Sequence, residues 1–336
     1  MGLKVAVLMG GQSFEREFSL DSGKRVCEAL EEAGHKVVPL DTNSELVPTL
    51  RSEKPDVVYS ALHGKHGEDG TIQSMLEFLD IPFVGSPASV CHRSYNKDAL
   101  HSSVAKYRDI TGDAGNASWP QGVFLARDAF KSMGLATALD LVPERVAGGF
   151  PLAVKPAHGG SALGVHKVED PDMLGEAILD ALSYDDAVNI EQWISGVELS
   201  VSILGTGWDA HALPPVEIVP KGQFFDAAAR LDNELVDFYC PPRPASLSPD
   251  PVQAEGIRAE IERAALEVYR AYSVRDLGRI DMIWDGAQAK CFEIDVSPGM
   301  TNHSLFPLSC ETAGLSMSAV LDELVQVAAG RAAFQL

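Results

Sequence analysis

Charged and apolar residues alternate along residues 278–304, GRIDMIWDGAQAKCFEIDVSPGMTNHS, in a pattern that could build a cation site. The alternation continues on both sides of a DG turn, which is typical of a β-hairpin with one buried face. The buried face is expected to carry Ile280, Met282, Trp284, Phe292, Ile294 and Val296. The opposite, open face is expected to carry Arg279, Asp281, Glu293 and Asp295.

Three carboxylates on one hairpin face would repel one another unless a cation joined them. Mg²⁺ binds through carboxylate oxygens and usually completes its shell with substrate phosphates. A solvated strand face whose charge is balanced by Arg279 would have the same sequence. The hairpin alone therefore leaves both interpretations open, a Mg²⁺ site and a solvated face.

A second segment, PLAVKPAHGGSALGVHKV at residues 151–168, has the residue types of a phosphate-binding loop. Two Val-containing strands are expected to flank Gly159, Gly160 and Gly164, whose backbone N–H groups could approach a phosphate closely. Lys155 at the end of the first strand could reach the same phosphate. A flexible turn has the same composition, and the chain contains neither G-x-x-x-x-G-K-[ST] nor a G-x-G-x-x-G dinucleotide fingerprint.

Other acidic and basic candidates are less specific. Glu191 and Glu198 in EQWISGVELS could hydrogen-bond an adenosine or could be surface acids, and alone the surface interpretation is favoured. His63 and His66 flank Gly64 in a loop, as a metal or catalytic pair would, but one exposed pair without a third ligand is usually structural or solvated.

Composition excludes several classes of protein. With 27 Lys and Arg against 48 Asp and Glu, the net charge of −21 repels nucleic-acid phosphate and anionic membranes. No apolar run is long enough for a membrane helix, and KVAVLMGG is too short for a signal peptide, so a cytoplasmic location is expected. The five cysteines lack C-x-x-C spacing, which predicts free thiols.

The elements that would position these residues predict an α/β protein. Apolar runs at 4–9 and 56–62 are expected to be parallel strands, joined through a helix at about 22–33 that stops at Gly34. This alternation over about 90 residues predicts an open doubly wound sheet. The pattern changes near Lys97, and helices are expected at 252–272 and 318–334. Residues 220–250 show no sustained period and are expected to form a long loop, with 220–243 as a candidate lid.

Taken together, these segments resemble the D-alanine:D-alanine ligases of the ATP-grasp superfamily over nearly the whole chain. The matching segments, in order, are SFEREFSLDSG at 13, ALHGKHGEDGTIQ at 61, IPFVGS at 81, NK at 96, VKPAHGGSALGV at 154, EQWISGVEL at 191, GRID at 278 and EIDVSPGMTNHSL at 293. The resemblance implies an ATP-grasp fold with an N-terminal parallel-sheet substrate-binding domain at 1–96. It also implies a central ATP-grasp subdomain at 97–200 and a C-terminal subdomain at 201–336.

The resemblance assigns roles to the candidates. Lys97 and Lys155 resemble the lysines that bind ATP phosphates, and Glu191 and Glu198 resemble the residues that hold adenine and ribose. The ligands of two Mg²⁺ ions, for which Mn²⁺ could substitute, would be Asp281, Glu293 and Asp295.

The resemblance also implies residues for the amino-acid substrates. Glu15 would pair with the ammonium of the first substrate, near His63, and Ser161 matches a serine linked to that acid. Arg279, the backbone N–H of Gly299 and the hydroxyl of Ser304 resemble groups around the acyl phosphate and the second substrate's carboxylate. Arg230 takes the place of the usual lid lysine.

The implied activity is a two-step, ATP-dependent ligation of D-alanine to D-alanine for a cell wall precursor, by a protein that is a homodimer in most of the family. Three departures concern the lid and the site: FFDAAARL, with Leu231 in place of a tyrosine, Asp295 in place of an asparagine, and His158 and Gly159 in place of a charged pair. They leave two alternatives open. One is a ligase with a different acceptor, and the other is a weakly active self-protection or regulatory relative.

Overall fold

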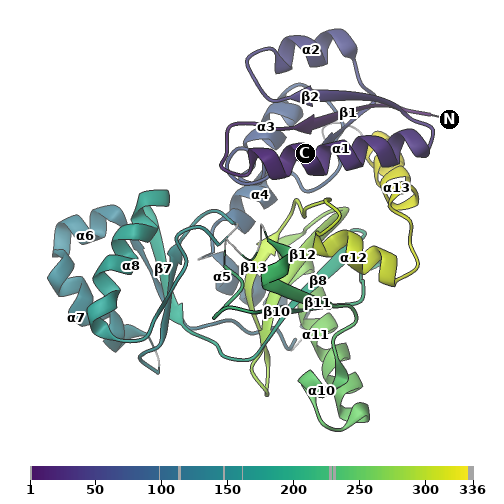
Figure 1. Ribbon diagram of the computed structural model, residues 1–336. Helices are drawn as coiled ribbons and strands as arrows, with labels where there is room; N and C mark the ends of the chain where they lie inside the picture. Colours follow the sequence, from purple (N-terminus) through teal and green to yellow (C-terminus); the bar gives the residue numbers. More distant parts are fainter. Residues whose placement is uncertain are drawn as a thin grey trace.

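The computed structural model describes residues 2–97, 99–112, 115–146, 148–160, 162–226, 229 and 232–331. Within these ranges the chain forms three sheets, each with helices packed against it (Figure 1). None of the described helices is both long enough and apolar enough to cross a bilayer. All five cysteines are free thiols, as the sequence predicts.

The first sheet has the parallel order β2-β1-β3, formed by β1 (Lys4–Met9), β2 (Lys36–Asp41) and β3 (Val57–Ser60). Its central strand β1 is apolar after Lys4 because both of its faces are covered. One face of β1 packs on α1 (Arg16–Glu32), and the other packs on α2 (Leu46–Glu53) and α3 (Thr71–Phe78). The prediction of a parallel sheet with helices on both faces is confirmed.

Helix α1 begins at Arg16, earlier than the apolar spacing predicts. Its first turns bury Ser19, Ser22 and Gly23 instead of large apolar side chains. A Cβ atom on Gly23 would lie 2.6 Å from Met9 Cβ, so a small residue is needed where α1 crosses β1. The helix ends as expected, because Gly34 has a φ of +88° and His35 donates its N–H to Leu30 O.

The second sheet has the antiparallel order β4-β7-β5-β6. Its strands are β4 (Gly122–Ala126), β5 (Leu152–Pro156), β6 (His166–Val168) and β7 (Ala187–Gln192). Three helices cover one face and enclose an apolar core: α6 (Arg127–Met133), α7 (Leu135–Arg145) and α8 (Pro171–Tyr184). The loop that connects β5 to β6 contains the glycine-rich segment.

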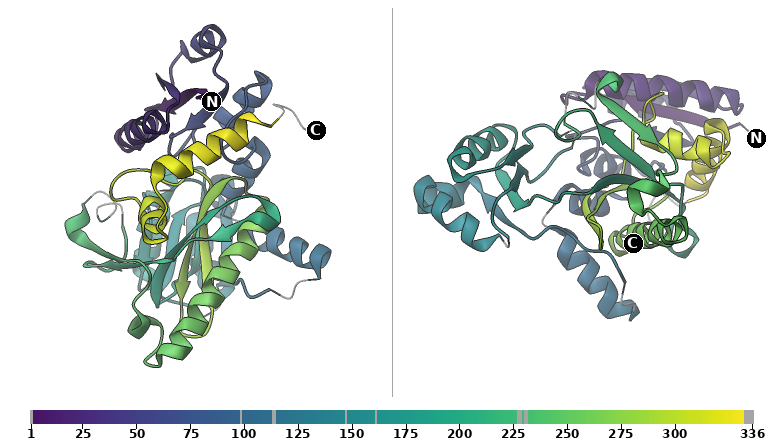
Figure 2. Two further views of the ribbon diagram at one scale, coloured as in Figure 1. Left: turned by 90° about the vertical axis from the view of Figure 1, so that its right-hand side faces the viewer. Right: turned by 60° about the horizontal axis from the view of Figure 1, so that its bottom comes forward.

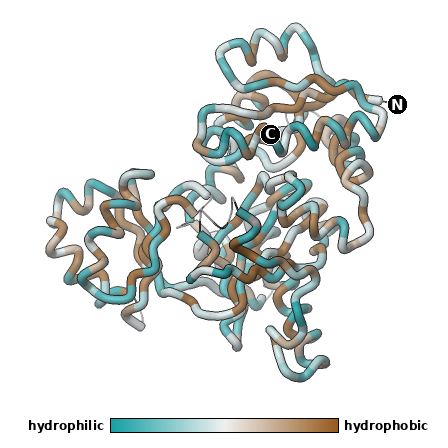
Figure 3. The backbone as a smooth tube through the Cα atoms, viewed as in Figure 1, coloured by the Kyte–Doolittle hydropathy of each residue, from teal (hydrophilic) through white to brown (hydrophobic). Residues whose placement is uncertain are grey.

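The third sheet follows the order β11-β10-β8-β12-β13, with the short β9 (His211–Ala212) beside β8. Its main strands are β8 (Val197–Leu204), β10 (Val216–Pro220), β11 (Val236–Tyr239), β12 (Leu277–Trp284) and β13 (Ala289–Asp295). Helix α11 (Pro251–Tyr272) packs on this sheet and on α5 (Ala99–Thr111), and α10 (Pro244–Leu247) packs against α11. Hydrophobic segments follow the strands of this sheet and of the other two (Figure 3).

The segment 220–250 is more regular than predicted. It contains β11, which pairs antiparallel with β10, a 3₁₀ turn at Asn233–Leu235 and the short helix α10. The expectation of one long loop is therefore wrong. The pattern was hidden because β11 has only four residues, too few to show a period.

The C-terminal part of the chain returns to the first sheet (Figures 1 and 2). After α4 (Ala88–Tyr95) the chain leaves that sheet, and α13 (Met317–Ala329) comes back to pack on α1 and β3. Helix α12 (Leu305–Thr312) packs on β8 and β10 of the third sheet and contributes to the core beneath the first. Phe306, Leu321 and Val325 are buried in the same core as Val5 and Val7 of β1. The first sheet therefore depends on residues more than 300 positions away in the sequence.

A buried carboxylate fixes this junction. Asp276, which is 2% exposed, accepts hydrogen bonds from the backbone N–H of Gly85 at 2.7 Å and from both terminal nitrogens of Arg331 at 2.5 and 2.6 Å. Arg331 also donates to the carbonyl of Phe83 at 2.9 Å. Asp276 immediately precedes β12, so the junction also fixes the start of the strand that carries Arg279 and Asp281.

We expect Arg331→Ala to lower the free energy of unfolding by about 3 kcal/mol, because it leaves the buried Asp276 carboxylate without its guanidinium partner. Denaturant unfolding followed by circular dichroism measures the change. Arg51→Ala, on the exposed surface of α2, is the matched control and should change stability by less than about 0.5 kcal/mol. Equal effects of the two substitutions would contradict a structural role for this pair.

Candidate active site

Two cavities meet at the place where the three sheets converge. The first has a volume of about 590 Å³ and lies between the second and third sheets. The second has a volume of about 450 Å³ and lies between the first and third sheets. Lys97, Gly160 and Glu293 line both cavities, so a ligand in one can touch a ligand in the other at this border.

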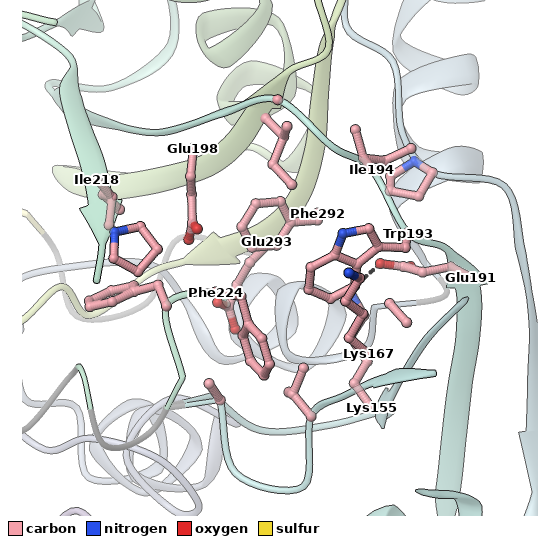
Figure 4. A pocket seen from close by; sticks show the side chains of 18 of the residues that line it. Lys155, Lys167, Glu191, Trp193, Ile194, Glu198, Ile218, Phe224, Phe292 and Glu293 are labelled. Carbon is pink, nitrogen blue, oxygen red and sulfur yellow. Dashed lines mark hydrogen bonds and ion pairs between the residues drawn. The ribbon is translucent and has the colours of Figure 1, made fainter. Parts of the chain in front are cut away.

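The first cavity has an apolar end suited to a flat ring. Trp193, Phe224 and Phe292 line it, and the rings of Trp193 and Phe224 meet edge to face with centroids 5.5 Å apart. Glu198 lines the same end, and Figure 4 shows it projecting toward the space that Phe224 and Phe292 enclose. The cavity continues from this ring-binding end to the border with the second cavity.

Lys155 and Glu191 form an ion pair in the wall of the first cavity (Figure 4). Lys155 Nζ lies 2.6 Å from Glu191 Oε1, and Asn189 donates to Glu191 Oε2 at 2.7 Å. Both partners are on neighbouring strands, β5 and β7. The surface interpretation of Glu191 is therefore wrong, because this residue is 8% exposed and opens only onto the cavity.

Lys97 occupies the border between the cavities. Its Nζ donates to the carbonyl of Gly159 and lies 3.9 Å from Glu293 Oε1. Burial lowers the pKa of Lys97, and the nearby carboxylate of Glu293 only partly offsets this effect. The glycine-rich loop is thereby tied to Lys97, which the family resemblance groups with Lys155 as a phosphate-binding lysine.

The second cavity collects acidic and aromatic groups from the first sheet. Glu15 lies at the N-terminus of α1 and packs so closely on Gly64 that a Cβ there would be 2.2 Å from Glu15 Oε2. His63 is 5% exposed, and its ring nitrogens lie 3.1 Å from Ser22 Oγ and 3.5 Å from Glu68 Oε1. The expectation that His63 would be exposed is wrong, since the ring is held on two sides.

Arg279 lies between two carboxylates at the base of the second cavity. Its Nε and Nη2 donate to the two oxygens of Asp281, each at 2.8 Å, and its Nη1 lies 2.9 Å from Asp295 Oδ2. Ser200 also donates to Asp281 Oδ1 at 2.8 Å. Burial alone would lower the pKa of Arg279, but Asp281 and Asp295 raise it well above its ordinary value, so the guanidinium stays charged.

The predicted hairpin forms and collects the four charged residues on one face, but that face is not open. Arg279 pairs with Asp295 and Asp281 pairs with Glu293, which places the four charged residues on one face. That face is buried, with Arg279 8% and Asp281 3% exposed, so the solvated alternative is wrong. A β-bulge after Asp281 puts Cys291 into the core and turns Phe292, which was expected there, into both cavities.

Two of the three predicted carboxylate ligands are placed to bind a divalent cation, and the third is not. Glu293 and Asp295 line the second cavity and offer the oxygen ligands that Mg²⁺ prefers. Asp281 is engaged by Arg279 and Ser200 and lines neither cavity. No group of three or more ligating side chains among the described residues is arranged to hold a metal ion. Burial raises the pKa of the Asp295 carboxyl, and Arg279 offsets part of this rise.

Gly299 and Ser304 lie across the second cavity from Glu15. A Cβ on Gly299 would be 2.6 Å from Phe18 Cζ and 2.8 Å from Ser304 Oγ. Ser304, which begins α12, accepts a hydrogen bond from the backbone N–H of Thr301 at 3.0 Å. The sequence analysis missed Phe18, whose ring lies 4.8 Å from that of His63.

Two of the candidates, Ser161 and Arg230, lie outside the described residues, as does Leu231. The other candidates all line one or both cavities, with the exception of Asp281: Glu15, His63, Lys97, Lys155, Glu191, Glu198, Arg279, Glu293, Asp295, Gly299 and Ser304. Phe18, Trp193 and Phe292 were missed as site residues because an aromatic residue in a strand or helix usually indicates core packing.

Comparisons with known proteins were made with both the sequence and the structure. The sequence model described as "D-ala D-ala ligase C-terminus" matches residues 129–326, and the one described as "D-ala D-ala ligase N-terminus" matches residues 46–86. A D-alanine–D-alanine ligase of Bordetella petrii is 37% identical over 97% of this chain and 92% of its own length.

Two solved structures illustrate the structural similarity. A D-alanine–D-alanine ligase from Bacillus anthracis, complexed with ATP, has a TM-score of 0.73 at 27% identity and covers 98% of this chain and 97% of its own. The VanG D-Ala:D-Ser ligase from Enterococcus faecalis has a TM-score of 0.76 at 25% identity and covers 97% of this chain and 99% of its own.

We expect Gly299→Ala to destabilise the protein by about 1–3 kcal/mol, because the added methyl group overlaps the ring of Phe18. Adding Phe18→Leu should recover part of that loss, and a double-mutant cycle of unfolding free energies measures the coupling. Gly256→Ala is the matched control: this residue lies on the exposed side of α11 with nothing within 4 Å of an added Cβ. It should leave stability unchanged or increase it, since alanine favours helix. Additive effects of Gly299→Ala and Phe18→Leu would contradict the proposed contact.

Proposed function

The chain belongs to the D-alanine–D-alanine ligase family, and we propose that it joins two D-alanine molecules at the expense of ATP. It is an ATP-dependent ligase that forms a peptide bond. The observation that supports the proposal most directly is the shared border of the two cavities. A nucleotide in the first cavity would present its terminal phosphate to an amino acid in the second.

In the proposed first step, the carboxylate of one D-alanine attacks the γ-phosphorus of ATP and ADP leaves, which gives an acyl phosphate. Glu15 would bind the ammonium group of this D-alanine, with His63 beside it. Lys97 and Lys155 would bind the phosphates, and Glu191 and Glu198 would bind the adenosine. Lys155 would then have to share Glu191 with the nucleotide, because the two side chains form an ion pair without it.

In the proposed second step, the amine of the second D-alanine attacks the acyl carbon and phosphate leaves. Arg279 and the backbone N–H of Gly299 would stabilise the negative charge on the tetrahedral oxygen, and Ser304 would bind the second carboxylate. The ion pairs of Arg279 suit it to this role, because they hold the guanidinium fully charged and fixed in place.

The proposal includes Mg²⁺, which would neutralise charge on the transferring phosphoryl group when bound. Glu293 and Asp295 are the ligands whose side chains open onto the second cavity. Asp281 would become a ligand only by exchanging part of its contact with Arg279. Asp295 adds a negative charge where the family usually has asparagine. The site should therefore bind divalent cations at least as tightly as a site with asparagine at this position.

The acyl phosphate reacts with water, so the site must exclude it. We propose that residues 220–243 close over the border of the cavities, with Arg230 on the substrates and Ser161 hydrogen-bonded near Glu15. Phe224 and Phe225 line the first cavity, which supports placing this segment at its entrance.

A ligase with a different second substrate is the alternative. Leu231 replaces a tyrosine of the family's lid, and one structural relative is a D-Ala:D-Ser ligase. Phosphate release with ATP, Mg²⁺ and D-alanine, combined with mass spectrometry of the product, tests the proposal. D-alanyl-D-alanine at good turnover supports it, whereas turnover only with a mixed pair of substrates supports the alternative.

Three further expectations accompany the function. The units 1–96, 97–200 and 201–336 are proposed as domains, although β8 starts before residue 201 and belongs to the third sheet. A homodimer is proposed, and sedimentation velocity tests it. A cytoplasmic location with a role in peptidoglycan precursor synthesis is proposed from the substrates.

We expect Arg279→Lys to lower kcat by about 100-fold or more while ATP affinity changes little, because a lysine cannot reproduce the three directed contacts of the guanidinium. Steady-state kinetics and calorimetric titration with ATP measure the two quantities. Arg258→Lys, on the solvent side of α11, is the control. Unchanged turnover of the Arg279 variant would rule out the assigned role.

We expect Asp295→Asn to retain Mg²⁺-dependent activity and to require a higher Mg²⁺ concentration, since one negative charge is removed. Activity measured against Mg²⁺ concentration tests this expectation. Complete inactivity at saturating Mg²⁺ would show that the charge of Asp295 is needed elsewhere, for instance to hold Arg279.

A further inference from the structure

A histidine and an aspartate form a pair at the start of the glycine-rich loop. Asp185, which follows the last residue of α8, accepts two hydrogen bonds from His158 through Oδ2. The backbone N–H of His158 donates at 2.8 Å, and the ring Nδ1 lies 2.9 Å away. Burial raises the pKa of the Asp185 carboxyl, but the hydrogen bonds from His158 outweigh this effect and hold the pKa below its usual range.

The imidazole ring of His158 is oriented by its neighbours. It stacks on Tyr95, with centroids 6.1 Å apart and an interplanar angle of 23°, and Phe124 meets it edge to face at 6.5 Å. With Nδ1 directed at Asp185, Nε2 lies on the opposite edge of the ring. The side chain is 36% exposed and lines the first cavity, beside Gly159 and Gly160.

The same loop is tied to Lys97. The backbone of His158 bridges to Asn96, Lys97 N–H donates to Ala157 O at 3.2 Å, and Lys97 Nζ donates to Gly159 O. His158 therefore shares the border end of the first cavity with Lys97, away from the ring-binding end that Trp193 and Phe224 form. If this cavity binds ATP, that end receives the phosphates.

We propose that His158 is a third basic group that binds the ATP phosphates, with Asp185 as the residue that positions its ring. The proposal rests on the proposed function, since it requires ATP in the first cavity. With the Nδ1 proton directed to Asp185, Nε2 can donate to a phosphate oxygen only when the ring is protonated. The ring would then lie between two anionic groups, Asp185 on one edge and the phosphates on the other. In a chain of net charge −21, such local positive charge is what an anionic ligand requires.

Three groups face the ring: the carboxylate of Asp185, the phenol of Tyr95, and Lys97 across Gly159. Asp185 is the one anion among them and is hydrogen-bonded to Nδ1, so Nε2 is the ring nitrogen left to contact a phosphate.

The test is calorimetric titration of the full-length protein with ATP, ADP and AMP in the presence of Mg²⁺, for wild type and His158→Asn. Asparagine can still donate to Asp185 from the position of Nδ1, but it has no group at the position of Nε2. We expect ATP and ADP to bind about 10-fold more weakly to the variant, which is the effect of one lost charged hydrogen bond. AMP should bind as it does to wild type, because it lacks the β- and γ-phosphates that the ring would contact.

His166→Asn is the matched control. His166 also pairs with an aspartate, Asp180, at 2.7 Å in the same part of the chain, and its side chain is 39% exposed. It does not line the first cavity, so its variant should bind all three nucleotides as wild type does. Asp185→Asn should reproduce part of the loss for ATP, because the carboxylate that orients the ring is removed.

The other possible results separate the assignment of His158 from the proposed ligase function. Equal weakening of ATP and AMP binding, or wild-type ATP affinity of His158→Asn, overturns the assignment of His158 and leaves the ligase function intact. A third result would also overturn the assignment: His158→Ala binds ATP weakly while His158→Asn binds it as wild type does. The contact with Asp185 alone would then account for the effect. Failure of the wild-type protein to bind ATP would instead overturn the proposed function, and with it this inference.

Discussion

The charged guanidinium of Arg279 between Asp281 and Asp295 is the interaction on which the arrangement of the site depends. Two buried carboxylates on adjacent strands would repel each other and pay a desolvation cost without a cation between them. Because β12 is paired on both sides, its register with β8 and β13 places this triad at a fixed point. The cavities, the glycine-rich loop and the ends of the first sheet are all arranged around that point. The sheet therefore positions charge in the site as well as filling the core.

The sequence was sufficient for the parts of the molecule that follow a clear period or resemble known segments. The parallel strands of the first sheet, the helix α11 and the pairing of Arg279 with the acidic strand β13 all follow from alternation or helical spacing. The sequence was insufficient where one extra residue or a small residue changes the geometry. The bulge that turns Phe292 into the cavities leaves no mark in the alternation. Ser19, Ser22 and Gly23 hide the first turns of α1, because close packing there is achieved by small side chains instead of apolar ones.

The site itself shows a similar division. The residue types that carry charge were found from the sequence, whereas the contacts among them were not. Lys155 and Glu191 are 36 positions apart, and only the pairing of β5 with β7 brings them together. The same holds for His158 and Asp185, whose contact depends on where α8 ends. Such pairs decide whether a charge is available to a ligand or is already neutralised. Which residues pair is set by the order and pairing of the strands and helices, which the local sequence does not show.

The return of the C-terminal part of the chain to the first sheet has a consequence for the order in which the protein can fold during synthesis. Val5 and Val7 belong to a core that Phe306, Leu321 and Val325 complete, so this core cannot close until the final part of the chain has left the ribosome. The second sheet has a core made only of residues between 123 and 190 and can form earlier. A nascent chain therefore carries an uncovered apolar face on its first strands for most of its translation, and this face is where association with chaperones or with other nascent chains would begin.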